Sequence, residues 1–142
     1  MSEHPNATKA REVFSALWER GDLQPTLAWI DDDVVWTNDI GAGPWAKEIR
    51  GKTRVLEMQG WWFEFFGGQF KHELLDVCAS DRHVVEILRE IGEKDGHVFD
   101  NRAVYLFQLG DAGTIVEVRT LDMDRDNIEA FWAAVDLPAG VG

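Results

Sequence analysis

Residues 70–123 read FKHELLDVCASDRHVVEILREIGEKDGHVFDNRAVYLFQLGDAGTIVEVRTLDM. Apolar and polar residues alternate through much of this stretch, and short polar segments interrupt it, as in β-strands joined by tight turns. The interruptions lie at residues 80–81, 93–96 and 110–113. We therefore predict four consecutive antiparallel strands, at residues 70–79, 83–91, 97–109 and 114–123.

Helical spacing of apolar residues marks four segments outside that stretch. They are residues 10–18, residues 23–30, residues 58–66, whose apolar face is mostly aromatic, and residues 128–135. A single strand at residues 34–38 lies between the second and third of them. The predicted order is α-α-β-α-β-β-β-β-α, an α+β fold with helices on the concave face of a curved antiparallel sheet. Such an arrangement leaves room for a central pocket.

Composition and charge limit the partners. The chain has 142 residues, 45% of them apolar, and we predict one domain at residues 1–137 with a disordered tail at 138–142. A formal net charge of −12 disfavours nucleic acid and anionic membranes. No apolar run is long enough for a membrane span, the N-terminus lacks the layout of a signal peptide, and Cys78 is the single cysteine. We expect a cytoplasmic protein.

Three stretches carry a family resemblance: Gly21 to Trp36, Pro44 to Lys52, and Asp100 to Val118. They resemble the SnoaL-like, or nuclear-transport-factor-2-like, superfamily, which includes polyketide cyclases, ketosteroid isomerase and limonene-epoxide hydrolase. The resemblance extends from Ala10 to Trp132. It implies a cone-shaped, cystatin-like domain with a pocket between sheet and helices. It does not define a reaction, because this fold hosts many.

The catalytic residues of ketosteroid isomerase match this chain only in part. Through the resemblance, its first-helix tyrosine falls on Phe14, its aspartate base on Asn38, and its strand-borne acid on Tyr105. The acid of the SnoaL-like cyclases also falls on Tyr105. Asn38 cannot take a proton at neutral pH, whereas the phenol of Tyr105 can still donate a hydrogen bond to a developing enolate.

Limonene-epoxide hydrolase gives a different partial match. Its water-holding tyrosine and asparagine fall on Trp36 and Asn38, its arginine and aspartate pair on Val84 and Glu86, and its second aspartate on Thr120. Opening an epoxide needs a general base for water and an acid for the epoxide oxygen. Glu86 could serve as one of the two, without the arginine that would orient it.

Glu86 is the first choice for a general base. Strand alternation leaves two possible inner faces, one with Val84, Glu86 and Leu88, the other with Val85, Ile87 and Arg89. On the first face, burial would raise the pKa of Glu86 and suit it to proton transfer, with Tyr105 as the hydrogen-bond donor. On the second face, Glu86 would be a solvated side chain.

Four more residues are catalytic candidates with structural alternatives. Asn38 would hold a water or a carbonyl, or cap the next turn. Tyr105 would stabilise an oxyanion, or make a core hydrogen bond. Asp122 would face the pocket, or add to the acidic cap of the last helix. Asp39 would transfer a proton only if a bulge turned it inward.

Further residues are predicted to contact a small apolar ligand, because tryptophan and phenylalanine commonly line pockets. They are Phe14, Trp18, Trp36, Met58, Trp62, Phe107 and Thr120. No metal is predicted, since His72, His83 and His97 lie on different strands without close spacing. No glycine-rich loop joins a strand to a helix as nucleotide phosphates require, so no cofactor is predicted.

Two functions fit these residues. The first is a cofactor-independent enzyme, an isomerase, cyclase or epoxide hydrolase, acting on an apolar carbonyl or epoxide compound such as a polyketide, steroid or terpenoid. The second is a non-catalytic protein that binds a small hydrophobic ligand. The enzyme requires a carboxylate inside the pocket within reach of Tyr105.

The convex face of the predicted sheet has no helix to cover it. Its outward residues include Val104, Leu106, Val116 and Leu121 or their alternates. An exposed apolar sheet face is typical of an interface. We therefore predict a homodimer through this face.

Overall fold

The α+β fold predicted from the sequence is confirmed. A computed structural model describes residues 2–39, 45 and 47–137; the predicted tail at 138–142 lies outside the described residues. The elements are α1 (Pro5–Arg20), α2 (Gln24–Trp29), β1 (Ile30–Thr37), β2 (Glu48–Arg50), α3 (Lys52–Phe65), β3 (Lys71–Ala79), β4 (His83–Lys94), β5 (His97–Leu109), β6 (Ile115–Asp122) and α4 (Arg125–Ala134). The short strand β2 is an addition to the predicted order.

Six strands form one sheet in the order β2-β1-β6-β5-β4-β3. Each neighbouring pair among β3, β4, β5 and β6 is antiparallel, as predicted. Strand β1 runs parallel to β6, with Trp36 opposite Val118, so the sheet is mixed rather than wholly antiparallel. No hairpin joins β1 to β6, and turn signals therefore carry no information on their relative direction.

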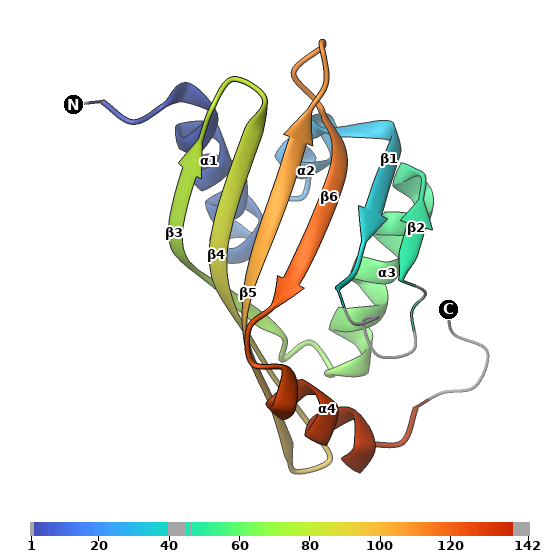
Figure 1. Ribbon diagram of the computed structural model, residues 1–142. Coiled ribbons are helices and arrows are strands. Elements are labelled where there is room, and N and C mark those ends of the chain that lie inside the picture. Colours follow the sequence, from blue (N-terminus) through green and yellow to red (C-terminus); the bar gives the residue numbers. More distant parts are fainter. Residues whose placement is uncertain (1, 40–44, 46, 138–142) are drawn as a thin grey trace.

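The helices are unevenly distributed over the sheet. In Figure 1, α1, α2 and α3 lie behind the sheet, and α4 crosses its lower end. The hairpin of β4 and β5 extends down to α4. Its loop consists of Asp95 and Gly96, whose φ angles of 52° and 81° are the left-handed values of a two-residue type I′ turn.

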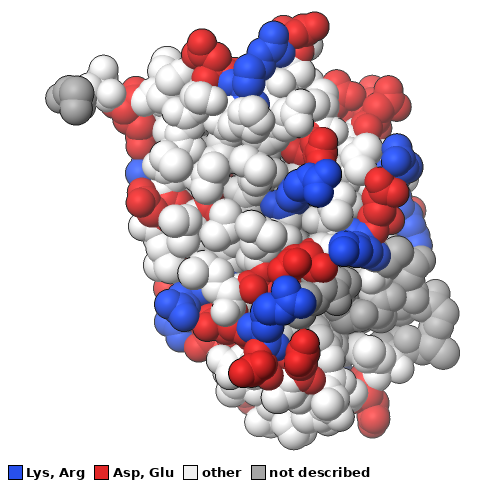
Figure 2. Space-filling view, viewed as in Figure 1, with Lys and Arg blue, Asp and Glu red and all other residues white. Residues whose placement is uncertain are grey.

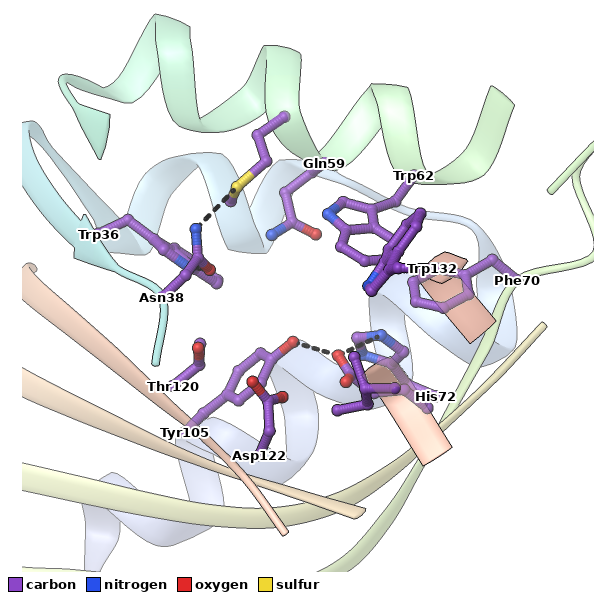
Figure 3. A pocket seen from close by; sticks show the side chains of 13 residues that line it. Trp36, Asn38, Gln59, Trp62, Phe70, His72, Tyr105, Thr120, Asp122 and Trp132 are labelled. Carbon is purple, nitrogen blue, oxygen red and sulfur yellow. Dashed lines mark hydrogen bonds and ion pairs between the residues drawn. The ribbon is translucent and has the colours of Figure 1, made fainter. Parts of the chain in front are cut away.

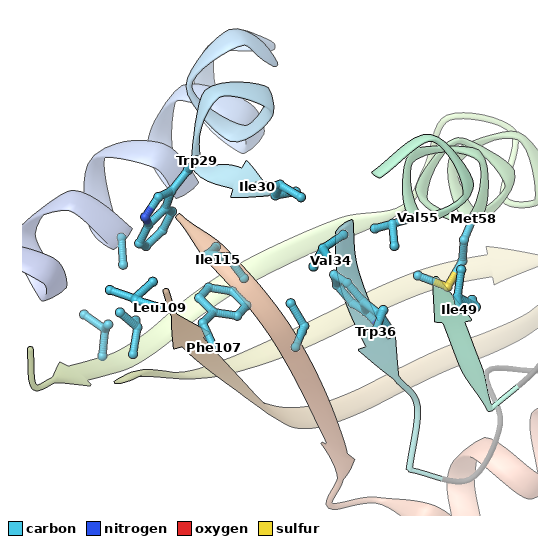
Figure 4. Close-up of a cluster of buried hydrophobic side chains, with 14 of the residues drawn as sticks. Trp29, Ile30, Val34, Trp36, Ile49, Val55, Met58, Phe107, Leu109 and Ile115 are labelled. Carbon is cyan, nitrogen blue, oxygen red and sulfur yellow. The ribbon is translucent and has the colours of Figure 1, made fainter. Parts of the chain in front are cut away.

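Two hydrophobic clusters fill the space between sheet and helices. One lies between the sheet, α2 and α3 and includes Trp29, Val34, Trp36, Val55 and Met58 (Figure 4). The other is almost wholly aromatic and joins the end of α3 to the β4–β5 hairpin and α4; its buried members are Phe65, Phe66, Phe70, Phe99, Ile128, Phe131 and Val135. The predicted aromatic face of α3 contributes to both.

Two glycines give a matched test of this packing. Gly60 lies inside α3, and a Cβ added there would meet no atom within 4 Å. Gly60→Ala should therefore raise the free energy of unfolding by about 0.5–1 kcal/mol, the usual gain in a helix interior. A Cβ at Gly92 would lie 2.7 Å from the Phe66 ring, so Gly92→Ala should destabilise. Urea denaturation measures both, and equal effects would contradict this packing.

The face of the sheet opposite α1, α2 and α3 carries aliphatic side chains. In the register, Val85 pairs with Leu106, and Ile87 pairs with Val104, which pairs in turn with Leu121. Leu121 is 51% exposed. Figure 2 shows this face, with an uncharged area over β3, β4 and β5 and charged groups around it. Exposed apolar faces of this kind often mark interaction sites.

We propose that this face pairs with the same face of a second copy. Leu121→Glu should then convert a dimer to a monomer, because an isologous contact would bring two charges together. Leu23→Glu is the control, since Leu23 is also exposed, at 42%, but precedes α2 on the other side of the sheet. Light scattering coupled to gel filtration measures the mass. A monomeric parent protein at tens of micromolar would refute the proposal.

Candidate functional site

Two adjoining chambers lie on the helix-covered side of the sheet. The apolar chamber has a volume of about 300 Å³ and lies between α1, α2, α3 and the sheet. The polar chamber, of about 40 Å³, lies between α3, α4 and the lower ends of the strands. Four residues line both chambers and form the boundary between them: Trp36, Gln59, His72 and Tyr105.

The structure places the predicted ligand-contacting residues around these chambers. Phe14, Trp18, Trp36 and Phe107 line the apolar chamber. The remaining three, and Trp36 again, line the polar chamber: Met58, Trp62 and Thr120. Figure 3 shows Trp62 and Gln59 descending from α3 toward Tyr105, Thr120 and Asp122 on the sheet.

Glu90 is the best-connected carboxyl of the polar chamber. Tyr105 Oη donates a hydrogen bond to Glu90 Oε2 at 2.5 Å, and Asn101 Nδ2 donates to Glu90 Oε1 at 2.8 Å. Asn101 Nδ2 also donates to Asp122 Oδ1 at 2.9 Å. Burial raises the pKa of Glu90 to about 7, although the two hydrogen bonds oppose this shift. Glu90 therefore exchanges its proton near neutral pH.

The predicted hydrogen-bond partner of Tyr105 is wrong. The predicted partner is Glu86, which does pair with Tyr105 across β4 and β5. The phenol, however, leans along the strand and reaches Glu90, two inward positions further on. Glu90 was missed, although it shares the strand parity of Glu86 and follows the same inner face.

Glu86 occupies the inner face of β4. Its neighbours Val84 and Leu88 are buried with it, and Glu86 is 5% exposed, which settles the phase that the sequence left open. Burial raises the pKa of its carboxyl to about 8. No hydrogen bond reaches this carboxyl from the residues that the structure describes. Glu86 is therefore mainly protonated at neutral pH and faces the apolar chamber.

Two aromatic residues outside the predicted site, His72 and Trp132, also line the polar chamber. The His72 ring stacks on Trp18 with centroids 4.1 Å apart, and burial lowers its pKa to about 3, so the imidazole is neutral. His72 Nε2 lies 3.4 Å from Glu90 Oε2 without forming a hydrogen bond. Trp132 Nε1 is also buried without a partner among the described residues.

Asn38 and Asp122 line the polar chamber, whereas Asp39 lies behind Asp122. Trp36 Nε1 donates to Asn38 Oδ1 at 2.9 Å, and Asn38 is buried and lines the chamber. Asp122 also lines it, and burial raises the pKa of its carboxyl. Asp39 is not among the described lining residues; its Oδ2 accepts from Asp122 N and from Arg125 Nη1.

The raised pKa of the buried Glu86 carboxyl should make the stability of the protein depend on pH. Because its pKa is higher in the folded chain, the folded state binds the extra proton, and stability falls as pH rises from its unfolded value to about 8. Between about pH 6 and about pH 9 the free energy of unfolding of the parent protein falls, and Glu86→Gln should reduce this fall by roughly 1–3 kcal/mol. Chemical denaturation at both pH values measures it. Glu93→Gln, an exposed change on the same strand, should leave the loss intact; equal curves for both variants would contradict the prediction.

Fold and site define a cone-shaped α+β protein with an aromatic pocket. Residues 10–118 match the model of the SnoaL-like domain, so the chain belongs to the SnoaL-like family. A comparison with curated proteins gave no significant match. None of the described helices is long and apolar enough to cross a membrane, and no group of three or more potential metal ligands occurs among the described residues.

Solved structures share the fold. The chain is 26% identical to Bal32a from a soil-derived mobile gene cassette, with a TM-score of 0.79 over 89% of this chain and 95% of Bal32a. It is 18% identical to a protein from Jannaschia sp. CCS1 assigned as a SnoaL-like polyketide cyclase, with a TM-score of 0.71 and coverage of 96% and 99%. TerC, co-crystallised with polyporic acid, is 16% identical, with a TM-score of 0.73 and coverage of 92% and 100%.

Proposed function

We propose that the protein is a cofactor-independent enzyme that moves a proton on an apolar, enolisable carbonyl compound, as an isomerase or cyclase does. One observation carries the proposal: the buried carboxyl of Glu90, whose pKa is about 7, accepts a hydrogen bond from Tyr105 at the boundary of an apolar chamber. The family match supports a ligand-binding or cyclase role, as does the Jannaschia relative.

The apolar chamber suits the body of such a substrate. Its volume of about 300 Å³ is at the lower end of the range for small-molecule pockets. Its walls are mostly aromatic and aliphatic, so they favour a compact ring compound over a polar one. A substrate that fills this chamber presents one edge to Tyr105 and His72, which line both chambers.

The chemistry assigns different roles to Glu90 and Tyr105. The ionised Glu90 takes a proton from the carbon next to the carbonyl and returns it to another atom of the enolate. A base works best when its pKa lies near the working pH, as that of Glu90 does. Burial raises the pKa of Tyr105 well above its ordinary value, so the phenol keeps its proton. Its single O–H donates to Glu90 in the free protein, and it turns to the enolate oxygen as Glu90 takes up the substrate proton.

Proton exchange tests this proposal without knowledge of the natural substrate. The probe is 2-tetralone, a bicyclic ketone, and NMR in D₂O follows deuterium incorporation next to its carbonyl. The protein should accelerate exchange, and Glu90→Gln should slow the protein-dependent rate by roughly 10²-fold or more, the usual share of a general base. Tyr105→Phe should slow it by roughly 10²-fold through the loss of an oxyanion donor.

The control for this experiment is Glu93→Gln, because Glu93 is exposed on the same strand as Glu90. This variant should exchange protons at the parent rate. The parent rate should rise with pH through an apparent pKa of about 7, because the ionised form of Glu90 is the base. An unchanged rate in Glu90→Gln would refute the assignment of the base.

A non-catalytic binding protein is the second candidate. Asn38 and Phe14 favour it, because the resemblance to ketosteroid isomerase puts that enzyme's base and tyrosine at these positions. Trp36 Nε1 also donates to the Asn38 amide, which fixes it as part of the wall. Binding of 2-tetralone with no acceleration of exchange would select this alternative.

A further inference from the structure

Two buried polar atoms at the polar chamber have no hydrogen-bond partner among the described residues: Trp132 Nε1 and His72 Nε2. The side chain of His72 is only 5% exposed. Both residues line the polar chamber, whose volume is only about 40 Å³, and Figure 3 labels them among its lining side chains. Buried polar groups are normally paired, so these two atoms indicate a missing partner.

One of the two atoms is a hydrogen-bond donor and the other is an acceptor. The indole Nε1–H of Trp132 can only donate. His72 is neutral, because burial lowers its pKa to about 3, and its Nε2 accepts when the ring proton is on Nδ1. A hydroxyl group accepts one hydrogen bond and donates another, and it therefore satisfies both atoms at once.

The charge of the lining residues and the volume of the polar chamber further limit which ligand group can bind there. No lysine or arginine is among the described residues that line either chamber, whereas Glu86, Glu90 and Asp122 are. A carboxylate in the ligand would therefore meet carboxyl groups without a compensating cation. The polar chamber, at about 40 Å³, has room for a small group such as one hydroxyl but not for a ring.

We propose that the polar chamber binds a hydroxyl group of the substrate, between Trp132 Nε1 as donor and His72 Nε2 as acceptor, while the apolar body fills the larger chamber. The ligand is then a neutral, hydroxylated ring compound, such as a phenol, an enol or a cyclic alcohol. This inference rests on the proposed function, because it names the substrate class of the same site.

Matched probes test the hydroxyl without turnover. The compounds are 2-naphthol, 2-methylnaphthalene and 2-naphthoate, which share one ring system and differ in a single group. Titration by tryptophan fluorescence gives the three affinities. 2-Naphthol should bind about tenfold more tightly than 2-methylnaphthalene, because the methyl group leaves both atoms unpaired, and 2-naphthoate should bind most weakly. Equal affinity for naphthol and methylnaphthalene, or no binding of naphthol at its solubility limit, overturns the proposal.

Substitution at Trp132 locates the donor. Trp132→Phe keeps a ring but removes the N–H, so the preference for naphthol should fall by several-fold toward equality. Trp61→Phe is the control, since Trp61 belongs to the same aromatic cluster but is not among the described residues that line either chamber. In the parent protein, naphthol should move the Trp132 indole N–H resonance downfield in a ¹⁵N-correlated NMR spectrum. A full preference retained in Trp132→Phe contradicts the assigned donor.

The two proposals can fail separately. Proton exchange reports on Glu90 as the base, whereas the preference for naphthol over methylnaphthalene reports on the hydroxyl site at Trp132 and His72. If the parent protein accelerates exchange but shows no preference for naphthol, the hydroxyl site is refuted and Glu90 remains the base. If the parent protein prefers naphthol but does not accelerate exchange, the enzyme is refuted and the protein binds hydroxylated ring compounds.

Discussion

The pairing register of β4 and β5 is the constraint on which the rest of the molecule depends. Twelve residue pairs, from His83 with Gln108 to Lys94 with His97, join the two strands without a shift. This register sends Glu86 and Glu90 to the inner face with Tyr105 opposite. A slip by one residue would turn these groups to the solvent side and bring the outward residues into the interior. The two-residue loop at Asp95 and Gly96 holds the register, because its left-handed conformation leaves no spare residue.

The chambers combine groups that stabilise the fold with groups that oppose it. Glu86, Glu90 and Trp132 Nε1, which has no partner in the described part of the chain, are all costly to bury. The aromatic cluster around α3 and α4 offsets this cost, since its rings stack and meet edge to face over a continuous apolar area. Some of these rings also line the polar chamber, so the walls of the site contribute stability that its buried polar groups oppose.

Sequence patterns predict the elements well here and the site only in part. The strands and α3 are long and periodic, and their positions follow from that periodicity. The direction of β1 does not, because it depends on pairing with a strand at the other end of the chain. The phase of β4 also stays open, because residues 84, 86 and 88 and residues 85, 87 and 89 each contain two apolar residues and one charged residue. The sequence does not single out Glu90 as a site residue, because it lies among other charged residues. It does not single out Trp132, because the spacing of Trp132 also fits an ordinary core position.

The parallel pairing of β1 with β6 has a consequence for synthesis of the chain. Ile30 pairs with Ile115, and Trp36 with Val118, so β1 cannot join the main sheet until β6 has left the ribosome. Until then α1, α2 and α3 have no complete sheet to cover, and their apolar faces are available to chaperones. Such distant pairings slow folding, because loop closure precedes the contacts that reward it. The domain is therefore completed only after β6, and then α4 with its aromatic residues, have emerged.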